Sequence, residues 1–167
     1  MKTLNLTLKG IGKLSPTVMV DNKSLNFKKN AFGNYTTTFQ TDKNEVELAI
    51  INYLEISGKF WFLMGLFFFL ISLFGIFDMR VSKNCLVIKS RFKIYLDSNV
   101  TNFEAQINDK SGEKGISYNC NDKVEEIENI CYEDLVAKKR RKILFVTKIL
   151  LWIVLTVLSI LLLVKNL

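Results

Sequence analysis

Residues 60–77 read FWFLMGLFFFLISLFGIF, a run of 18 residues without a charged side chain. A helix of this length reaches about 27 Å at 1.5 Å per residue, which is close to the thickness of the hydrocarbon core of a bilayer. Lys59 precedes the run, and Asp78 and Arg80 follow it. The run therefore predicts a first transmembrane helix over residues 59–78.

A second apolar run lies near the end of the chain and predicts a second transmembrane helix over residues 143–165. The two predicted spans leave an N-terminal segment, residues 1–58, and a central segment, residues 79–142. Each segment is near the lower limit of length at which a chain buries a core of its own. The sequence thus predicts two small modules separated by a pair of membrane helices.

The N-terminal segment contains short stretches in which apolar and polar residues alternate. Leu4, Leu6 and Leu8 recur at every second position, as in a strand with one buried face. Later stretches of the same kind are separated by turn-forming residues such as Asp21 and Gly33. This pattern predicts a small antiparallel β-sandwich-like module.

The spacing of these predicted strands, from VMVDNK at 18–23 to VELAI at 46–50, resembles that of known small β-sandwich modules. The similar modules are those of the PEGA and carboxypeptidase-regulatory type, whose Pro-Gly signature this segment lacks. The resemblance implies the sandwich fold, and no functional residue is carried over from it.

The central segment is expected to contain two kinds of structure. Residues 79–121 alternate in the manner of strands and predict a β-meander. Beyond them, apolar residues recur at steps of three and four, at Val124, Ile127, Cys131 and Leu135. That period indicates an amphipathic helix with Asp122 as its N-cap, so a helix is expected over residues 122–142. The predicted fold class is therefore an α+β membrane protein.

Five consecutive basic residues precede the second predicted span: Lys138, Lys139, Arg140, Arg141 and Lys142. They account for much of the net charge of +7. A basic run beside an apolar span is typical of a topology determinant that also contacts anionic lipid headgroups. Nucleic-acid binding is not expected, because no aromatic residues are interleaved with the basic ones and no known binding motif is present.

Small and polar residues inside the predicted spans are candidates for helix–helix packing. They are Gly65, Ser72 and Gly75 in the first span and Lys148, Thr156 and Ser159 in the second. Two interpretations of the second set stay open. Its members face another helix, or the lysine snorkels to the headgroups while the hydroxyls bond to their own helix backbone.

The distribution of Lys and Arg predicts the orientation in the membrane. Lys59 is the one basic residue among residues 45–59, up to the start of the first apolar run, whereas five follow the first span and five precede the second. We therefore expect a multi-pass protein of the plasma membrane, with residues 79–142 in the cytoplasm and both termini outside.

All three cysteines of the sequence, Cys85, Cys120 and Cys131, lie in this central segment. Thiols in a reducing compartment need no disulfide partner. If the segment lies outside the cell instead, Cys120 and Cys131 are the expected disulfide pair.

Nothing in the sequence points to catalysis. Histidine is absent, which removes the commonest general base and metal ligand, and no glycine-rich phosphate loop is present. We therefore expect no catalytic residue, metal, cofactor or small-molecule substrate.

The expected function is that of a non-enzymatic bacterial membrane protein that binds or scaffolds. It would act as an accessory subunit of an envelope, secretion or transport assembly, with the lipid bilayer and other membrane subunits or a second copy as partners. The alternatives are a bacterial immunity-type membrane protein and a component of an oligomeric pore or transporter.

Overall fold

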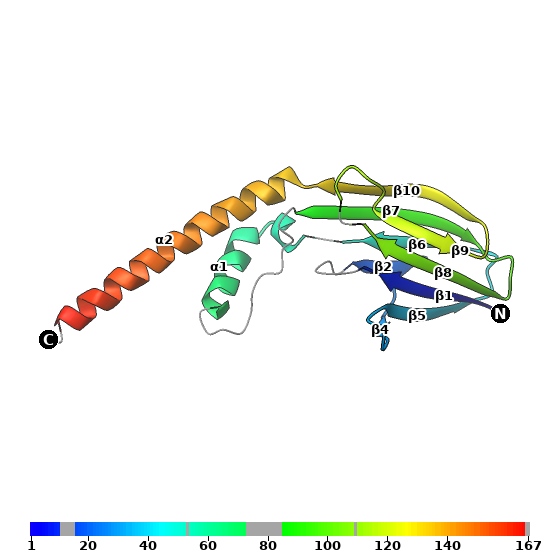
Figure 1. The fold of residues 1–167 in the computed structure, drawn as a ribbon, viewed down its shortest axis with the longest axis horizontal. Helices are drawn as coiled ribbons and strands as arrows, with labels where there is room; N and C mark the ends of the chain where they lie inside the picture. Colours follow the sequence, from blue (N-terminus) through cyan, green and yellow to red (C-terminus); the bar gives the residue numbers. More distant parts are fainter. Residues whose placement is uncertain (11–15, 53, 73–84, 109, 166–167) are drawn as a thin grey trace. The chain divides into compact units, whose positions relative to one another are not determined.

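The computed structural model describes most of the chain. The described residues are 1–10, 16–52, 54–72, 85–108 and 110–165. The chain divides into two compact units, and each is described by itself. The first unit comprises Met1–Tyr53 and Leu86–Glu133 and is built from strands, whereas the second comprises Leu54–Cys85 and Asp134–Leu167 and is helical (Figure 1).

The described strands of the first unit form two five-stranded sheets (Figure 1). The first sheet has the order β4-β5-β1-β8-β9, with strands β1 (Lys2–Lys9), β4 (Lys28–Lys29), β5 (Tyr35–Thr41), β8 (Val100–Ile107) and β9 (Ile116–Cys120). The second has the order β10-β7-β6-β2-β3, with strands β2 (Thr17–Val20), β3 (Lys23–Ser24), β6 (Glu45–Ile51), β7 (Leu86–Tyr95) and β10 (Val124–Glu133). Strands β1 and β8 pair in parallel, and the other described pairs are antiparallel.

Strands from both sides of the apolar run lie together in each sheet. In the first sheet β1 pairs with β8, which places Leu6 opposite Phe103, and in the second β6 pairs with β7. The sequence predicted separate modules over residues 1–58 and 79–121, but the structure has one sandwich built from both segments. Each segment alone is near the lower limit of length for a core of its own, and in the structure the two share one core.

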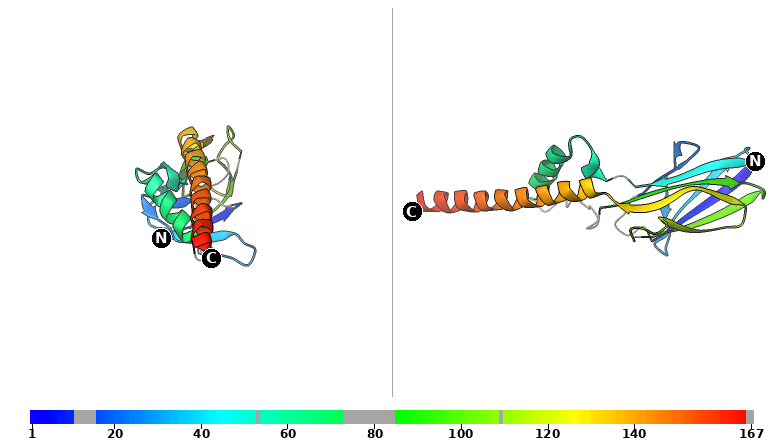
Figure 2. Two further views of the ribbon diagram at one scale, coloured as in Figure 1. Left: turned by 90° about the vertical axis from the view of Figure 1, so that its left-hand side faces the viewer. Right: turned by 90° about the horizontal axis from the view of Figure 1, so that it is seen from above.

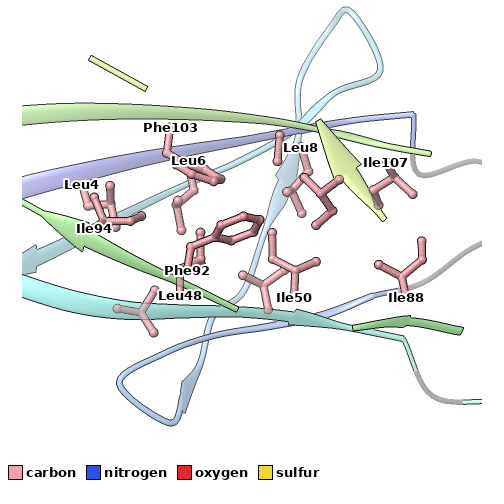
Figure 3. Packing of buried hydrophobic residues seen from close by; sticks show 14 of the residues in the cluster. Leu4, Leu6, Leu8, Leu48, Ile50, Ile88, Phe92, Ile94, Phe103 and Ile107 are labelled. Carbon is pink, nitrogen blue, oxygen red and sulfur yellow. The ribbon is translucent and has the colours of Figure 1, made fainter. Parts of the chain in front are cut away.

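The core of the sandwich lies between the two sheets (Figure 3). Leu4, Leu6 and Leu8 are buried, which confirms the alternation predicted for the first strand. From β7 of the other sheet, the ring of Phe92 lies 5.5 Å, centroid to centroid, from that of Phe103 in β8. The two sheets are therefore held together by side chains that come from before and after the apolar run.

Strand β10 replaces the first part of the amphipathic helix expected over residues 122–142. It pairs antiparallel with β7, and a β-bulge lies between Glu126 and Glu128. Because the bulge adds one residue, Val124 and Cys131 both face inward although they are seven positions apart. A regular strand gives an even spacing, whereas seven residues match two helical turns, so the bulge produced the helical pattern in the sequence.

Asp122 also differs from its predicted role, because it caps no helix. Its carboxylate accepts hydrogen bonds from the hydroxyl of Ser98, in the turn between β7 and β8, and from that of Thr101, near the start of β8. Burial alone raises the pKa of the Asp122 carboxyl, but these hydrogen bonds outweigh it and hold the pKa below its ordinary value. The residue thus fixes one turn of the sandwich to another.

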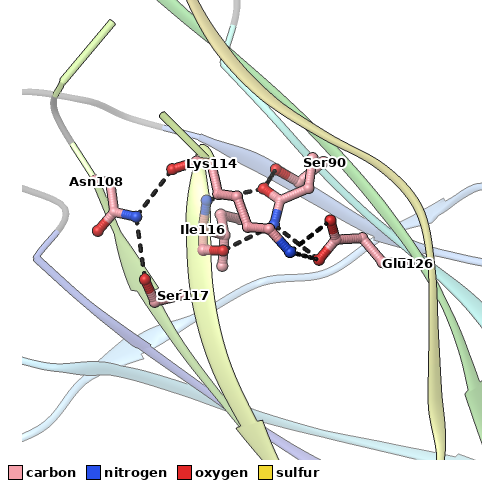
Figure 4. A network of polar contacts seen from close by, with 7 residues as sticks. Ser90, Asn108, Lys114, Ile116, Ser117 and Glu126 are labelled. Atoms are coloured by element: carbon pink, nitrogen blue, oxygen red, sulfur yellow. Dashed lines mark hydrogen bonds and ion pairs between the residues drawn. The ribbon is translucent and has the colours of Figure 1, made fainter. Parts of the chain in front are cut away.

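A buried amide connects the two sheets where β9 approaches β10 (Figure 4). Asn129 Oδ1 accepts a hydrogen bond from the backbone N–H of Ile116 at 2.9 Å, and Asn129 Nδ2 donates to the backbone oxygen of Ile116 at 2.8 Å. Ser90 Oγ donates to the same Oδ1 at 2.9 Å. The side chain thus replaces a backbone partner for the first residue of β9.

The second unit contains a short 3-10 helix η1 (Glu55–Ser57) and the helices α1 (Trp61–Ser72) and α2 (Leu135–Lys165), as Figure 2 also shows. Among the described residues, α2 is the one helix long and apolar enough to cross a membrane. The structure therefore has one candidate span there, where the sequence predicted two. Residues 73–78 of the first predicted span lie outside the described residues.

Replacing Asn129 with alanine is expected to destabilise the sandwich by about 2 kcal/mol, because the buried N–H and C=O of Ile116 lose their partners. Urea unfolding of the full chain in detergent micelles measures the loss, and hydrogen exchange at the Ile116 amide locates it. Asn119→Ala, at an exposed position of β9, is the matched control. Equal, small effects of both substitutions would show that the amide bridge is not needed.

Candidate functional site

The candidate site is the junction at which the chain enters its long apolar helix. Asp134 immediately precedes α2, and its Oδ1 accepts hydrogen bonds from the backbone N–H groups of Val136 and Ala137, each at 2.9 Å. The carboxylate thereby caps N–H groups that lack a partner within the helix. The hydrogen bond from Ala137 is the largest influence on the Asp134 carboxyl and, with the others, lowers its pKa below the ordinary value.

Asp134 also connects α2 to both ends of the segment Leu54–Cys85. Ser57 Oγ, near the start of that segment, donates to Asp134 Oδ2 at 3.0 Å. At its other end, the backbone oxygen of Cys85 accepts a hydrogen bond from the Asp134 N–H at 3.0 Å. The segment therefore leaves from and returns to the same place, the first turn of α2.

The Arg140 guanidinium donates hydrogen bonds to backbone oxygens at the end of η1. Its Nη1 lies 3.0 Å from the backbone oxygen of Ile56, 2.8 Å from that of Ser57 and 3.4 Å from that of Gly58. Its guanidinium carbon lies 5.3 Å from the centre of the Trp61 ring, at the first residue of α1. A planar guanidinium donates and stacks at once, which a lysine ammonium cannot reproduce.

The other members of the predicted basic cluster are placed differently from Arg140. Lys139 and Lys142 are exposed, whereas Lys138 and Arg141 are partly buried. The exposed pair lies just before the apolar part of α2, at the level where headgroups would meet the helix. Lipid contact by the cluster stays a prediction.

Helix α1 packs along the first half of α2, and the two helices run in the same direction (Figures 1 and 2). The contacts advance together along both helices, from Trp61 with Arg140, through Gly65 with Leu144, to Phe69 with Lys148 and Trp152.

Gly65 permits this close approach. A Cβ atom at Gly65 would lie 2.7 Å from Leu144 Cδ1, closer than side chains pack. Of the other candidates in the first predicted span, the side chain of Ser72 and the whole of Gly75 lie outside the described residues.

The polar residues of α2 divide between the two interpretations. The Lys148 ammonium lies 5.9 Å from the centre of the Phe69 ring, so it is on the side that packs against α1. The hydroxyls of Thr156 and Ser159 each donate to the carbonyl oxygen four residues earlier, at 2.8 Å. These two are therefore satisfied within their own helix.

The described residues of the sandwich offer no comparable group of interacting polar side chains. An open depression of about 580 Å³ on the outer face of the second sheet is lined by charged residues that pair with one another. Lys43 Nζ lies 2.5 Å from Asp21 Oδ2, and Lys93 Nζ lies 3.0 Å from Glu45 Oε2. Within the described part of the chain, no three His, Cys, Asp or Glu residues are grouped to hold a metal ion.

The three cysteines all lie in the described part of the chain, and no disulfide joins them. Cys85 and Cys131 are buried, and Cys120 is partly buried. Burial raises the pKa of the Cys120 thiol, so this thiol is less reactive than an exposed one.

Comparison with known protein families, with curated proteins and with solved structures finds no match for this chain.

Asp134→Ala is expected to weaken the start of α2 by about 1 kcal/mol. Because the folded-state pKa lies below the ordinary value of 3.8, the cap is fully formed above that value and is lost as the pH falls through the lower folded pKa. Amide chemical shifts of Val136 and Ala137, followed by NMR in micelles during an acid titration, report this step. Asp97→Ala, at an exposed turn position, should leave those shifts unchanged.

Arg140→Lys is expected to release η1 although the charge is kept, because one ammonium cannot donate to three carbonyls and stack on Trp61. Faster hydrogen exchange at the Ser57 amide measures the release. The control, Lys139→Gln, removes a charge but leaves the contacts of Arg140 with η1 and Trp61 intact. Its Ser57 amide should exchange at the wild-type rate. Slow exchange in Arg140→Lys would mean that charge alone holds η1.

Proposed function

We propose that the protein is a non-enzymatic membrane-anchored binding protein. In this proposal α2 alone crosses the plasma membrane, and the β-sandwich is displayed on the cytoplasmic side for other membrane subunits or a second copy. The sandwich binds the partner, and the α2 anchor restricts this binding to the bilayer surface.

The observation that carries the proposal is the pairing of strands across the apolar run. Paired strands lie about 4.8 Å apart, whereas the hydrocarbon core is about 30 Å thick. A sheet therefore cannot form between segments on opposite sides of a bilayer. The pairing of β1 with β8 and of β6 with β7 requires both halves of the sandwich on one side, and this replaces the expected double crossing.

The charge distribution supports a cytoplasmic sandwich. Met1–Tyr53 and Leu86–Glu133 together hold 13 Lys or Arg and 13 Asp or Glu residues, so the sandwich unit carries no net charge. The helical unit holds 10 basic and 3 acidic residues and carries the whole +7. Its basic cluster lies at the end of α2 that joins the sandwich, and only Lys165 follows the apolar part.

The placement of Lys148 does not favour the alternative of a pore component. It is the one ionisable residue between residues 143 and 164, and its ammonium lies over the Phe69 ring. A transport pathway usually carries several polar residues that face a cavity.

Sidedness is tested with cysteines introduced singly at Phe32 and Ser111, which are both exposed and lie on either side of the apolar run in the sequence. A membrane-impermeant maleimide is expected to label neither position in intact cells and both after permeabilisation. A tag added after Leu167 should be detected by antibody on intact cells. The wild-type chain supplies the blank for its own three thiols.

Labelling at Phe32→Cys but not at Ser111→Cys in intact cells would restore the double crossing and end the proposal. Labelling at both positions would keep a single crossing but place the sandwich outside.

A further inference from the structure

We propose that α1 enters only the leaflet on the sandwich side, so that the protein occupies more area in that leaflet than in the other. The partner of α1 is the acyl-chain region of this leaflet. The inference rests on the proposed single crossing by α2. Its functional consequence is a preference for curved membranes in which the leaflet on the sandwich side is the convex one.

Helix α1 belongs to an insertion in a β-hairpin. Strands β6 and β7 are antiparallel neighbours with Ile51 opposite Lys89, and the Asn52 N–H donates to the backbone oxygen of Ile88 at 3.1 Å. Such strand ends are normally joined by a loop of about 2–5 residues. The sheet therefore needs no helix at this point, and α1 serves another purpose.

The surface of α1 suits lipid. No charged residue occurs in Trp61–Ser72, and the side that packs on α2 carries Gly65 and Phe69. Away from that side, Leu63 is 64% exposed and Phe67 is 56% exposed. A helix with large apolar side chains outside its contact face is stable in hydrocarbon and a liability in water.

Contacts with α2 define how deep α1 reaches. Trp61 lies beside Arg140, within the basic cluster that marks the headgroup level. Phe69 contacts Trp152, with ring centroids 6.2 Å apart. Residue 152 is nine positions beyond Ile143, the first residue of the apolar part, which amounts to about 14 Å and about half of the hydrocarbon core.

The two helices therefore give the protein unequal cross-sections. Helix α2 contributes one helix, about 10 Å wide, to both leaflets. Helix α1 adds a second helix to the sandwich-side leaflet, and the described contacts end near the midplane. Material inserted on one side expands that leaflet, and binding of this kind is sensitive to curvature.

The depth of α1 is tested by tryptophan quenching with the full chain in phosphatidylcholine–phosphatidylglycerol vesicles. Three forms each keep one tryptophan: Trp61 alone, Trp152 alone, and Leu70→Trp with Trp61→Phe and Trp152→Phe. Lipids brominated near the chain end are expected to quench positions 152 and 70 most strongly. Lipids brominated near the headgroup are expected to quench position 61 most strongly.

If position 70 is quenched like position 61, α1 lies along the interface and the inference is wrong. The sidedness assay is independent of this result. Labelling of Phe32→Cys but not of Ser111→Cys from outside defeats the proposed single crossing, whereas shallow quenching with both positions on one side of the membrane defeats only the leaflet insertion.

The curvature preference is tested on membrane tubes pulled from giant vesicles that carry the protein with its sandwich outward. The wild type is expected to be enriched on the tube relative to the vesicle, increasingly as the tube narrows. The comparison variant replaces residues 54–85 with a short Gly-Asn-Gly turn, and protection of the Ile116 amide verifies that its sandwich is folded. This variant is expected to give a ratio near one, and equal enrichment of both proteins would overturn the inference.

Discussion

Backbone hydrogen bonds between strands separated by the apolar run impose the constraint on which the rest of the structure depends. Strand β8 lies beside β1, and β7 lies beside β6, so neither half of the chain completes a sheet alone. Burial follows from that pairing, because Phe92 and Phe103 enter a core to which Leu4 and Leu6 contribute. Because both halves share one core, the apolar run between them is an insertion in the hairpin formed by β6 and β7.

Local patterns in the sequence predicted the elements better than their partners. The period of Leu4, Leu6 and Leu8 is a property of neighbouring residues, and it predicted a strand that the structure contains. The partner of that strand is a property of the whole chain, since Leu6 and Phe103 are almost a hundred residues apart. The strand β10 shows a second limit, because a single bulged residue changed an alternating pattern into one with helical spacing.

The same division applies to the candidate site. Their positions in the sequence made the basic cluster and Gly65 candidates, but they did not predict that Arg140 donates to carbonyls more than 80 residues away. The cap at Asp134 was missed because the expected helix was placed from residue 122, which put Asp134 inside it. An Asp followed directly by a helix is a recognisable N-cap, and only the wrong starting point concealed it.

The separation of charge between the two units has a physical consequence for the proposed function, in which the chain binds a membrane and a protein partner. An anionic membrane attracts the helical unit, which carries the whole net charge, while the neutral sandwich feels little net force beyond a Debye length of about 8 Å. On the outer face of the second sheet, Lys89, Arg91 and Lys93 of β7 pair with acidic residues of β6 and β10. The charges of this face already neutralise one another, so a partner that bound here, as proposed, would be selected by short-range contacts. In the proposed function, membrane attachment and partner recognition thus rest on different parts of the chain, and a change in ionic strength would act chiefly on membrane attachment.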